Sequence, residues 1–82
     1  MRLREKITLR QSNEINTLFA EGLEKNIEKI IKRIAVNDDG TEITDILDLP
    51  EEEIYEIFGS YVIKKNNLKK NFMDKMKDLI PV

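Results

Sequence analysis

The chain has 82 residues, of which 40% are hydrophobic and 37% charged, with a formal net charge of −2, no cysteine and no histidine. This composition excludes disulfides, thiolate nucleophiles and histidine-based metal or acid–base sites, and it predicts one small folded domain rather than a disordered chain. No apolar run approaches the roughly 20 residues that span a bilayer. The first residues also lack the apolar stretch of a secretory signal, so we expect a cytoplasmic protein without membrane contact.

The charges are sorted along the chain into three zones. Residues 1–36 carry eight basic and five acidic groups, residues 37–57 carry nine acidic groups and no basic one, and residues 58–82 carry six basic and two acidic groups. The zones therefore have net charges of +3, −9 and +4, which sum to −2. Because opposite charges steer surfaces together, this layout predicts attraction between parts of one chain or between two copies of it.

Residues 1–11 favour a short β-strand or an arm. Apolar side chains at positions 3, 7 and 9 alternate with polar ones at positions 6, 8 and 10, and this period of two is typical of a strand. A charged first helical turn or a loose arm fits the same short run. Ser12 then offers a side-chain oxygen as the N-cap of a helix.

Residues 12–36 are predicted to be helical, because apolar residues recur there at spacings of three and four. Gly22 interrupts this apolar stripe and is a weak helix former, so the segment is either one helix that runs through Gly22 or two helices that meet there. The stripe consists of Ile15, Leu18, Phe19, Leu23, Ile27, Ile30, Ile31 and Ile34.

The acidic zone predicts a turn and two short helices. Asn37 to Gly40 forms the turn, since glycine supplies its left-handed geometry. A helix over residues 42–48 would bury Ile43, Ile46 and Leu47. A second helix over residues 50–58 would begin with Pro50 and three glutamates, which suit the positive end of the helix dipole, and would end at Gly59.

Residues 66–80 predict a basic C-terminal helix that Pro81 stops. Its apolar residues are spaced as one face: Leu68, Phe72, Met73, Met76, Leu79 and Ile80. Three of them, Phe72, Met73 and Met76, are expected to join the core. The predicted fold is all-α: a single-domain helical bundle over residues 1–82 with a long helix, two short acidic helices, a basic C-terminal helix and an N-terminal strand or arm.

No set of residues predicts catalysis, a metal site or a cofactor. The acidic cluster of Glu51, Glu52, Glu53 and Glu56 is not accompanied by a histidine, a glycine-rich phosphate loop or a nucleophile. We interpret it as a solvated helix face or as the acidic side of a protein-binding surface. The basic side would consist of Lys64, Lys65, Lys69 and Lys70. Contact of this basic helix with phosphates stays open.

The leading hypothesis is a non-enzymatic protein–protein interaction module that docks through charged helix faces. Its partner would be another protein or a second copy, so we expect an oligomer. An adaptor, an assembly factor, an inhibitor or a regulator would fit. The chain is rich in Ile, Lys and Asn, a usage typical of AT-rich genomes such as those of low-GC bacteria and their phages, and a phage or a plasmid would be a natural source.

The alternative hypothesis comes from the run Lys6-Ile7-Thr8-Leu9-Arg10-Gln11-Ser12, which loosely resembles the opening of ribbon-helix-helix DNA-binding proteins. In that family two chains pair their N-terminal strands, and polar side chains of this ribbon read the major groove. The resemblance covers residues 1–36 and implies that Lys6, Thr8 and Arg10 contact DNA and that Gly22 forms the turn between two helices. The function would then be a dimeric DNA-binding regulator or a partition protein.

Overall fold

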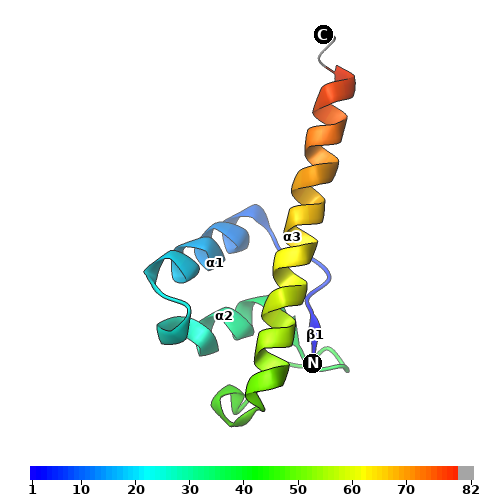
Figure 1. Cartoon of the computed structure of the whole chain (residues 1–82). Helices are drawn as coiled ribbons and strands as arrows, with labels where there is room; N and C mark the ends of the chain where they lie inside the picture. Colours follow the sequence, from blue (N-terminus) through cyan, green and yellow to red (C-terminus); the bar gives the residue numbers. More distant parts are fainter. Residues whose placement is uncertain (80–82) are drawn as a thin grey trace.

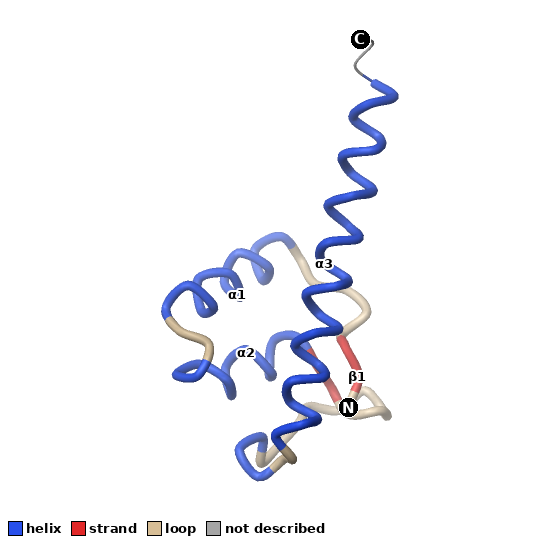
Figure 2. Tube along the Cα trace, viewed as in Figure 1, coloured by secondary structure: helices blue, strands red, loops and turns tan. Residues whose placement is uncertain are grey.

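The computed structural model describes residues 1–79 and consists mainly of helices, with one small β-element (Figures 1 and 2). This confirms the predicted small helical bundle with an N-terminal β-arm. The elements in chain order are β1 (Arg2–Leu3), α1 (Leu9–Glu21), the 3₁₀ turn η1 (Glu24–Asn26), α2 (Ile27–Ile34), β2 (Ala35–Val36), the 3₁₀ turn η2 (Ile46–Asp48) and α3 (Glu51–Leu79).

The N-terminal strand is much shorter than the alternating pattern suggested. β1 pairs antiparallel with β2 of the same chain, with Arg2 opposite Val36 and Leu3 opposite Ala35. The Arg4 N–H extends this pairing by donating to the carbonyl of Ile34 at 2.8 Å. Since β2 has only two residues, the ladder ends there. The N-terminal run therefore combines the alternatives that the sequence left open: a short strand at Arg2–Leu3, an arm after it, and the first turn of α1 from Leu9.

Helix α1 begins at Leu9, three residues earlier than predicted, because Thr8 and not Ser12 is its N-cap. The Gln11 N–H donates to the Thr8 hydroxyl at 3.2 Å, and the Thr8 N–H donates to the Gln11 side-chain oxygen at 2.9 Å. Such a capping box needs a Gln or Glu three residues after the cap. Ser12 has Ile15 at that position, so only Thr8 can satisfy both donors.

The helix breaks at Gly22, which resolves the alternatives for residues 12–36 in favour of two helices. Gly22 has φ +134°, a conformation that side chains disfavour, and α1 ends there. The buried Asn26 stabilises the corner, since its amide donates to the carbonyls of Leu18 at 3.0 Å and Gly22 at 3.1 Å. α2 then runs only to Ile34, and residues 35–36 form β2 instead of a last helical turn.

The acidic zone contains the predicted turn at residues 37–40 but no helix over residues 42–48. Only η2 forms there, because Asp45 adopts a left-handed conformation (φ 53°) that an α-helix cannot contain. Ile43 and Ile46 are buried as expected, whereas Leu47 is exposed. This segment therefore joins the core through two side chains and otherwise runs along the surface.

Helix α3 starts as predicted, with the N–H groups of Glu53 and Ile54 donating to the Pro50 carbonyl. It does not end at Gly59 but continues to Leu79 as one helix of 29 residues. A glycine inside a helix costs only about 1 kcal/mol relative to alanine. The burial of Ile57, Phe58 and Tyr61 on both sides of Gly59 stabilises the helix by more than that. The prediction of separate helices over residues 50–58 and 66–80 is wrong, and the predicted stop at Ile80 and Pro81 lies outside the described residues.

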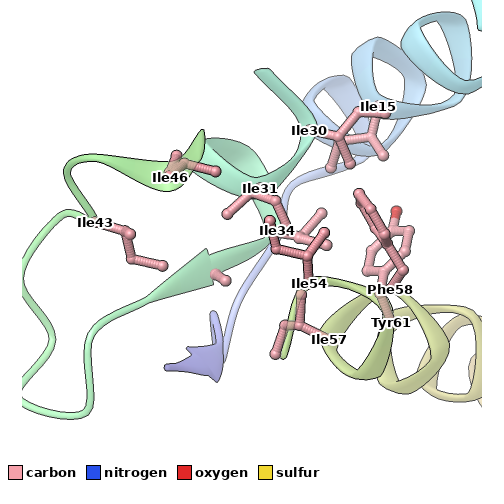
Figure 3. Close-up of a cluster of buried hydrophobic side chains, with 11 residues drawn as sticks. Ile15, Ile30, Ile31, Ile34, Ile43, Ile46, Ile54, Ile57, Phe58 and Tyr61 are labelled. Carbon is pink, nitrogen blue, oxygen red and sulfur yellow. The ribbon is translucent and has the colours of Figure 1, made fainter. Parts of the chain in front are cut away.

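The core lies between α1, α2 and the first half of α3 (Figure 3). The Phe19 ring contacts Phe58 edge-on at a centroid distance of 6.0 Å and stacks on Tyr61 at 6.3 Å. Packed aromatic pairs of this kind add to the stability that burial provides. Ten of the buried side chains are labelled in the figure: Ile15, Ile30, Ile31, Ile34, Ile43, Ile46, Ile54, Ile57, Phe58 and Tyr61.

Candidate functional site

The second half of α3 projects beyond the rest of the described chain (Figure 1). At a rise of about 1.5 Å per residue, α3 is about 43 Å long, whereas α1 with 13 residues and α2 with 8 are about 20 and 12 Å long. The whole structure measures 52 × 30 × 23 Å. The shorter helices therefore cannot cover α3 along its length, and we call residues 66–79 the free segment.

The free segment continues the apolar face that packs into the core. Ile54, Ile57, Phe58 and Tyr61 are buried on one side of α3. At about 100° per residue, the same side of the helix next presents four apolar side chains, which we call the docking stripe. They are Leu68 (61% exposed), Phe72 (60%), Met76 (partly exposed) and Leu79 (75%). The prediction that Phe72, Met73 and Met76 join the core is wrong, because no element of residues 1–79 lies over this part of α3: Phe72 and Met73 (57%) are exposed, and Met76 is only partly buried.

Two of the predicted partner-binding lysines hold α3 to its own chain. The Lys64 ammonium donates to the carbonyls of Arg4 at 3.1 Å and Glu5 at 3.4 Å. The Lys65 ammonium donates to the Asn16 side chain in α1 and lies 5.9 Å from the Tyr61 ring centroid. Partial burial, and then the charge of Lys69, lower the pKa of Lys65 below its ordinary value. These residues mark the level at which α3 leaves the core.

The remaining charges give the docking stripe a basic rim. Lys69 and Lys75 flank it on its two sides, while Lys70 lies on the opposite side of α3, as the helical repeat of about 100° per residue requires. Asp74 and Asp78 also lie outside the stripe by the same repeat. A partner that covers the stripe would therefore meet positive charge on both flanks.

A groove of about 270 Å³ opens at the base of the stripe. Its apolar wall consists of Ile7 from the N-terminal arm with Tyr61 and Leu68 from α3, and Ser12 and Lys64 contribute polar atoms. Because Leu68 belongs to both features, the groove and the stripe form one continuous surface. An apolar side chain of a partner could enter the groove while its neighbours cover the stripe.

The predicted acidic cluster lies at the other end of α3. Glu51, Glu52, Glu53 and Glu56 are exposed in its first two turns, where they complement the helix dipole. Within residues 1–79 none of the four forms an ion pair.

Elsewhere in the acidic zone, three carboxylates have partners within the chain. Asp38 contacts the N-terminal ammonium at 3.0 Å, and Glu42 contacts Arg4 at 2.7 Å. The hydroxyl and the N–H of Thr41 donate to Asp39 and lower its pKa. These contacts fasten the turn to the N-terminal arm and leave the glutamates of α3 unpaired.

The three residues of the ribbon alternative do not share a strand. Lys6 lies in the connection after the arm, Thr8 caps α1, and Arg10 is in the first turn of that helix. Leu9 is exposed, and Ile7 is half-buried beside α3. The strand that the ribbon-helix-helix resemblance implied for these three residues is therefore not present in this structure, whereas Gly22 does lie between two helices, as the resemblance implied.

Two further observations bear on the chemistry of the described residues. No group of three or more Asp or Glu side chains among residues 1–79 could hold a metal ion. None of the helices in that range combines the length and the apolar character needed to cross a membrane.

No family model, curated protein or solved structure matches this chain. The surfaces of the chain itself therefore carry the evidence for its function, and the docking stripe exposes three large apolar side chains on one side of a helix. Sequence reasoning missed it as a surface because its spacing is that of a core helix. Helix length could have revealed it only together with two further facts: the break at Gly22, which the sequence left undecided, and the continuation of α3 through Gly59, which the sequence did not predict.

Proposed function

We propose that this chain is a non-enzymatic protein–protein interaction module that binds its partner through the docking stripe of α3. The observation that carries the proposal is the exposure of Leu68, Phe72 and Leu79 on the same helix side that forms the core. Exposed contiguous apolar surface rimmed by polar residues is typical of interaction sites. An adaptor, an assembly factor or an inhibitor would each use such a surface.

The flanking charge favours an acidic protein surface as the partner. Lys69 and Lys75 border the stripe, and Lys6, Lys64 and Lys65 line the groove at its base. An amphipathic helix or a shallow groove with apolar anchors and acidic edges would satisfy both features. Since exposed ion pairs are screened by salt, the affinity for such a partner should fall as the salt concentration rises.

The test is capture of partners from a lysate of the organism that encodes the chain, followed by calorimetric titration of each captured protein with the purified chain. A double variant Leu68→Ser/Phe72→Ser removes two anchors of the stripe. Because buried apolar anchors dominate binding energy at interfaces, we expect this variant to bind a genuine partner at least tenfold more weakly. Both side chains are exposed, so the fold should survive, as circular dichroism would show.

The matched control is Leu47→Ser, which also replaces an exposed leucine but lies in the acidic zone, away from α3's free segment. It should bind the partner as tightly as the unaltered chain does. Equal capture by the stripe variant and by the control would overturn the proposal. A second result would also overturn it: the chain captures no protein from the lysate but binds phosphatidylserine vesicles through the stripe. The stripe would then be a membrane-binding surface.

A further inference from the structure

The side of α3 that faces away from the core forms a second uncovered surface, which we call the outer face. Its members recur with alternating spacings of four and three residues: Glu52, Glu56, Gly59, Ile63, Asn66, Lys70, Met73 and Lys77. This spacing places all eight on one side of the helix, and two of them, Ile63 and Met73, are large apolar residues. Ile63 is 63% exposed and Met73 57%, and Tyr55 and Val62 add exposed apolar surface along one edge.

The two ends of the outer face carry opposite charges. Glu52 and Glu56 lie at its beginning, and Lys70 and Lys77 lie towards its end. Within residues 1–79 none of these four forms an ion pair. Fourteen residues of helix separate Glu56 from Lys70, about 21 Å along the axis, so the two ends cannot meet within one straight helix.

We infer that this face binds a second copy of the chain, with the two α3 helices antiparallel. An antiparallel pair places the glutamates of each copy beside the lysines of the other, whereas a parallel pair would place like charges together. A two-fold symmetric contact of this kind satisfies both ends of both copies at once. The opposite charges at the two ends of α3 therefore attract each other between two chains. Within a single copy they lie too far apart along the helix to do so.

The charges also select a register for the pair, because they meet when Lys77 of one copy lies opposite Glu52 of the other. The two-fold axis then lies between Ile63 and Asn66, and Gly59 faces Lys70 of the second copy, since facing residues lie equally far from the axis. Gly59 is in open space, because a Cβ atom built there meets nothing within 4 Å. The fold of one chain therefore does not need a glycine at this position, and its bare backbone leaves room for the lysine side chain of the second copy. A polar residue such as Asn66 at the centre of a helix pair is known to select one register.

The dimer does not rest on the proposed docking function, because the outer face and the docking stripe lie on opposite sides of α3. Pairing through the outer face leaves both stripes accessible, so a dimer would present two of them. With only Ile63 and Met73 as large apolar residues in its seam, we expect an interface at the weak end of the usual size range.

The experiment is sedimentation equilibrium of the full chain over a range of about 1 µM to 1 mM, the range of weak association. Two charge-reversed variants are compared: Glu52→Lys/Glu56→Lys and Lys70→Glu/Lys77→Glu. Each should associate at least tenfold more weakly than the unaltered chain, because its outer face carries one sign of charge throughout. An equimolar mixture of the two should form a heterodimer, because each variant then offers what the other lacks.

Disulfide cross-linking checks the direction, since the chain contains no cysteine of its own. Gly59→Cys mixed with Lys70→Cys should form a cross-linked dimer under mild oxidation, and neither should cross-link efficiently with itself. Unchanged association of either charge variant, a mixture that stays monomeric, or self-cross-linking of both cysteine variants would each overturn the inference. Loss of the dimer in Leu68→Ser/Phe72→Ser would also overturn it, because the occupant of the docking stripe would then be the second copy.

Discussion

The two halves of α3 carry the same apolar face, but the rest of the chain covers it only in the first half. In the first half the face is buried, and Phe58 is 5% exposed; in the second half it is uncovered, and Phe72 is 60% exposed. Both phenylalanines belong to one continuous helix. Periodic apolar residues therefore define a helix face, but the length and position of the other elements decide whether that face becomes core or surface.

The largest contrast should come from the matched pair Phe58→Ala and Phe72→Ala. Removing a buried phenylalanine leaves a cavity and costs about 3–5 kcal/mol, whereas an exposed substitution changes stability by less than about 0.5 kcal/mol. Urea unfolding followed by circular dichroism at low protein concentration measures both free energies. Equal losses for the two variants would show that Phe72 is covered and that the halves do not differ.

A smaller contrast is expected at the level where α3 leaves the core. The Lys64 ammonium donates to two carbonyls of the N-terminal arm, and hydrogen bonds from a charged group are worth about 1.5–3 kcal/mol, less where water has access. Lys64→Ala should therefore lower the free energy of unfolding by about 1 kcal/mol. Lys69→Ala, just over one turn further along, should leave the free energy of unfolding unchanged. A loss at Lys69 as large as that at Lys64 would show that the core covers α3 further along than Lys64.

Gly59→Ala tests the continuity of the helix that joins the two halves. An added methyl group meets no neighbour within 4 Å, and alanine is favoured over glycine in a helix by up to about 1 kcal/mol. The variant should therefore be more stable than the unaltered chain when unfolding is measured on dilute, monomeric protein. A less stable variant would indicate that the chain turns at Gly59 and that the halves are separate helices.

The smallest effect on stability should come from Asp39, which lies outside α3 and belongs to neither of its halves. Hydrogen bonds from Thr41 lower its pKa, so the ionised form is favoured in the folded state. Its contribution is fully present above the unfolded pKa and is lost as the pH falls through the lower folded value. Thermal unfolding from pH 2 to 6 should show Asp39→Asn less stable only at the upper end. A difference that persists at pH 2 would point to a cause other than ionisation.

The sequence predicted the apolar faces well and their ends poorly. The stripe from Ile15 to Ile34 and the start of α3 at Pro50 follow directly from spacing and capping chemistry. Helix propensity could not distinguish the helix break at Gly22 from the continuous helix at Gly59, because both residues are glycines in apolar stretches. At Gly22 the buried Asn26 stabilises a corner by donating to two carbonyls, and at Gly59 nothing competes with the helix.

The candidate site was predictable only in part. The charges of α3 were visible in the sequence, and Glu51, Glu52, Glu53 and Glu56 are exposed as a surface cluster should be. The roles of Lys64 and Lys65 depend on contacts with Arg4, Glu5 and Asn16, which are about 50 to 60 positions away along the chain. Such long-range contacts leave no local pattern, so tertiary structure was needed to show which lysines are free.

The measurement that tests the central claim most directly is amide hydrogen exchange along α3. It is made on the monomeric variant Glu52→Lys/Glu56→Lys, so that pairing of two copies cannot protect the helix. Amides from Ile54 to Val62 should exchange slowly with the core, and those from Leu68 to Lys77 should exchange faster by orders of magnitude, since an uncovered helix end frays readily. Uniform slow exchange from Ile54 to Lys77 would contradict the account, because the docking stripe would then be covered by the chain itself.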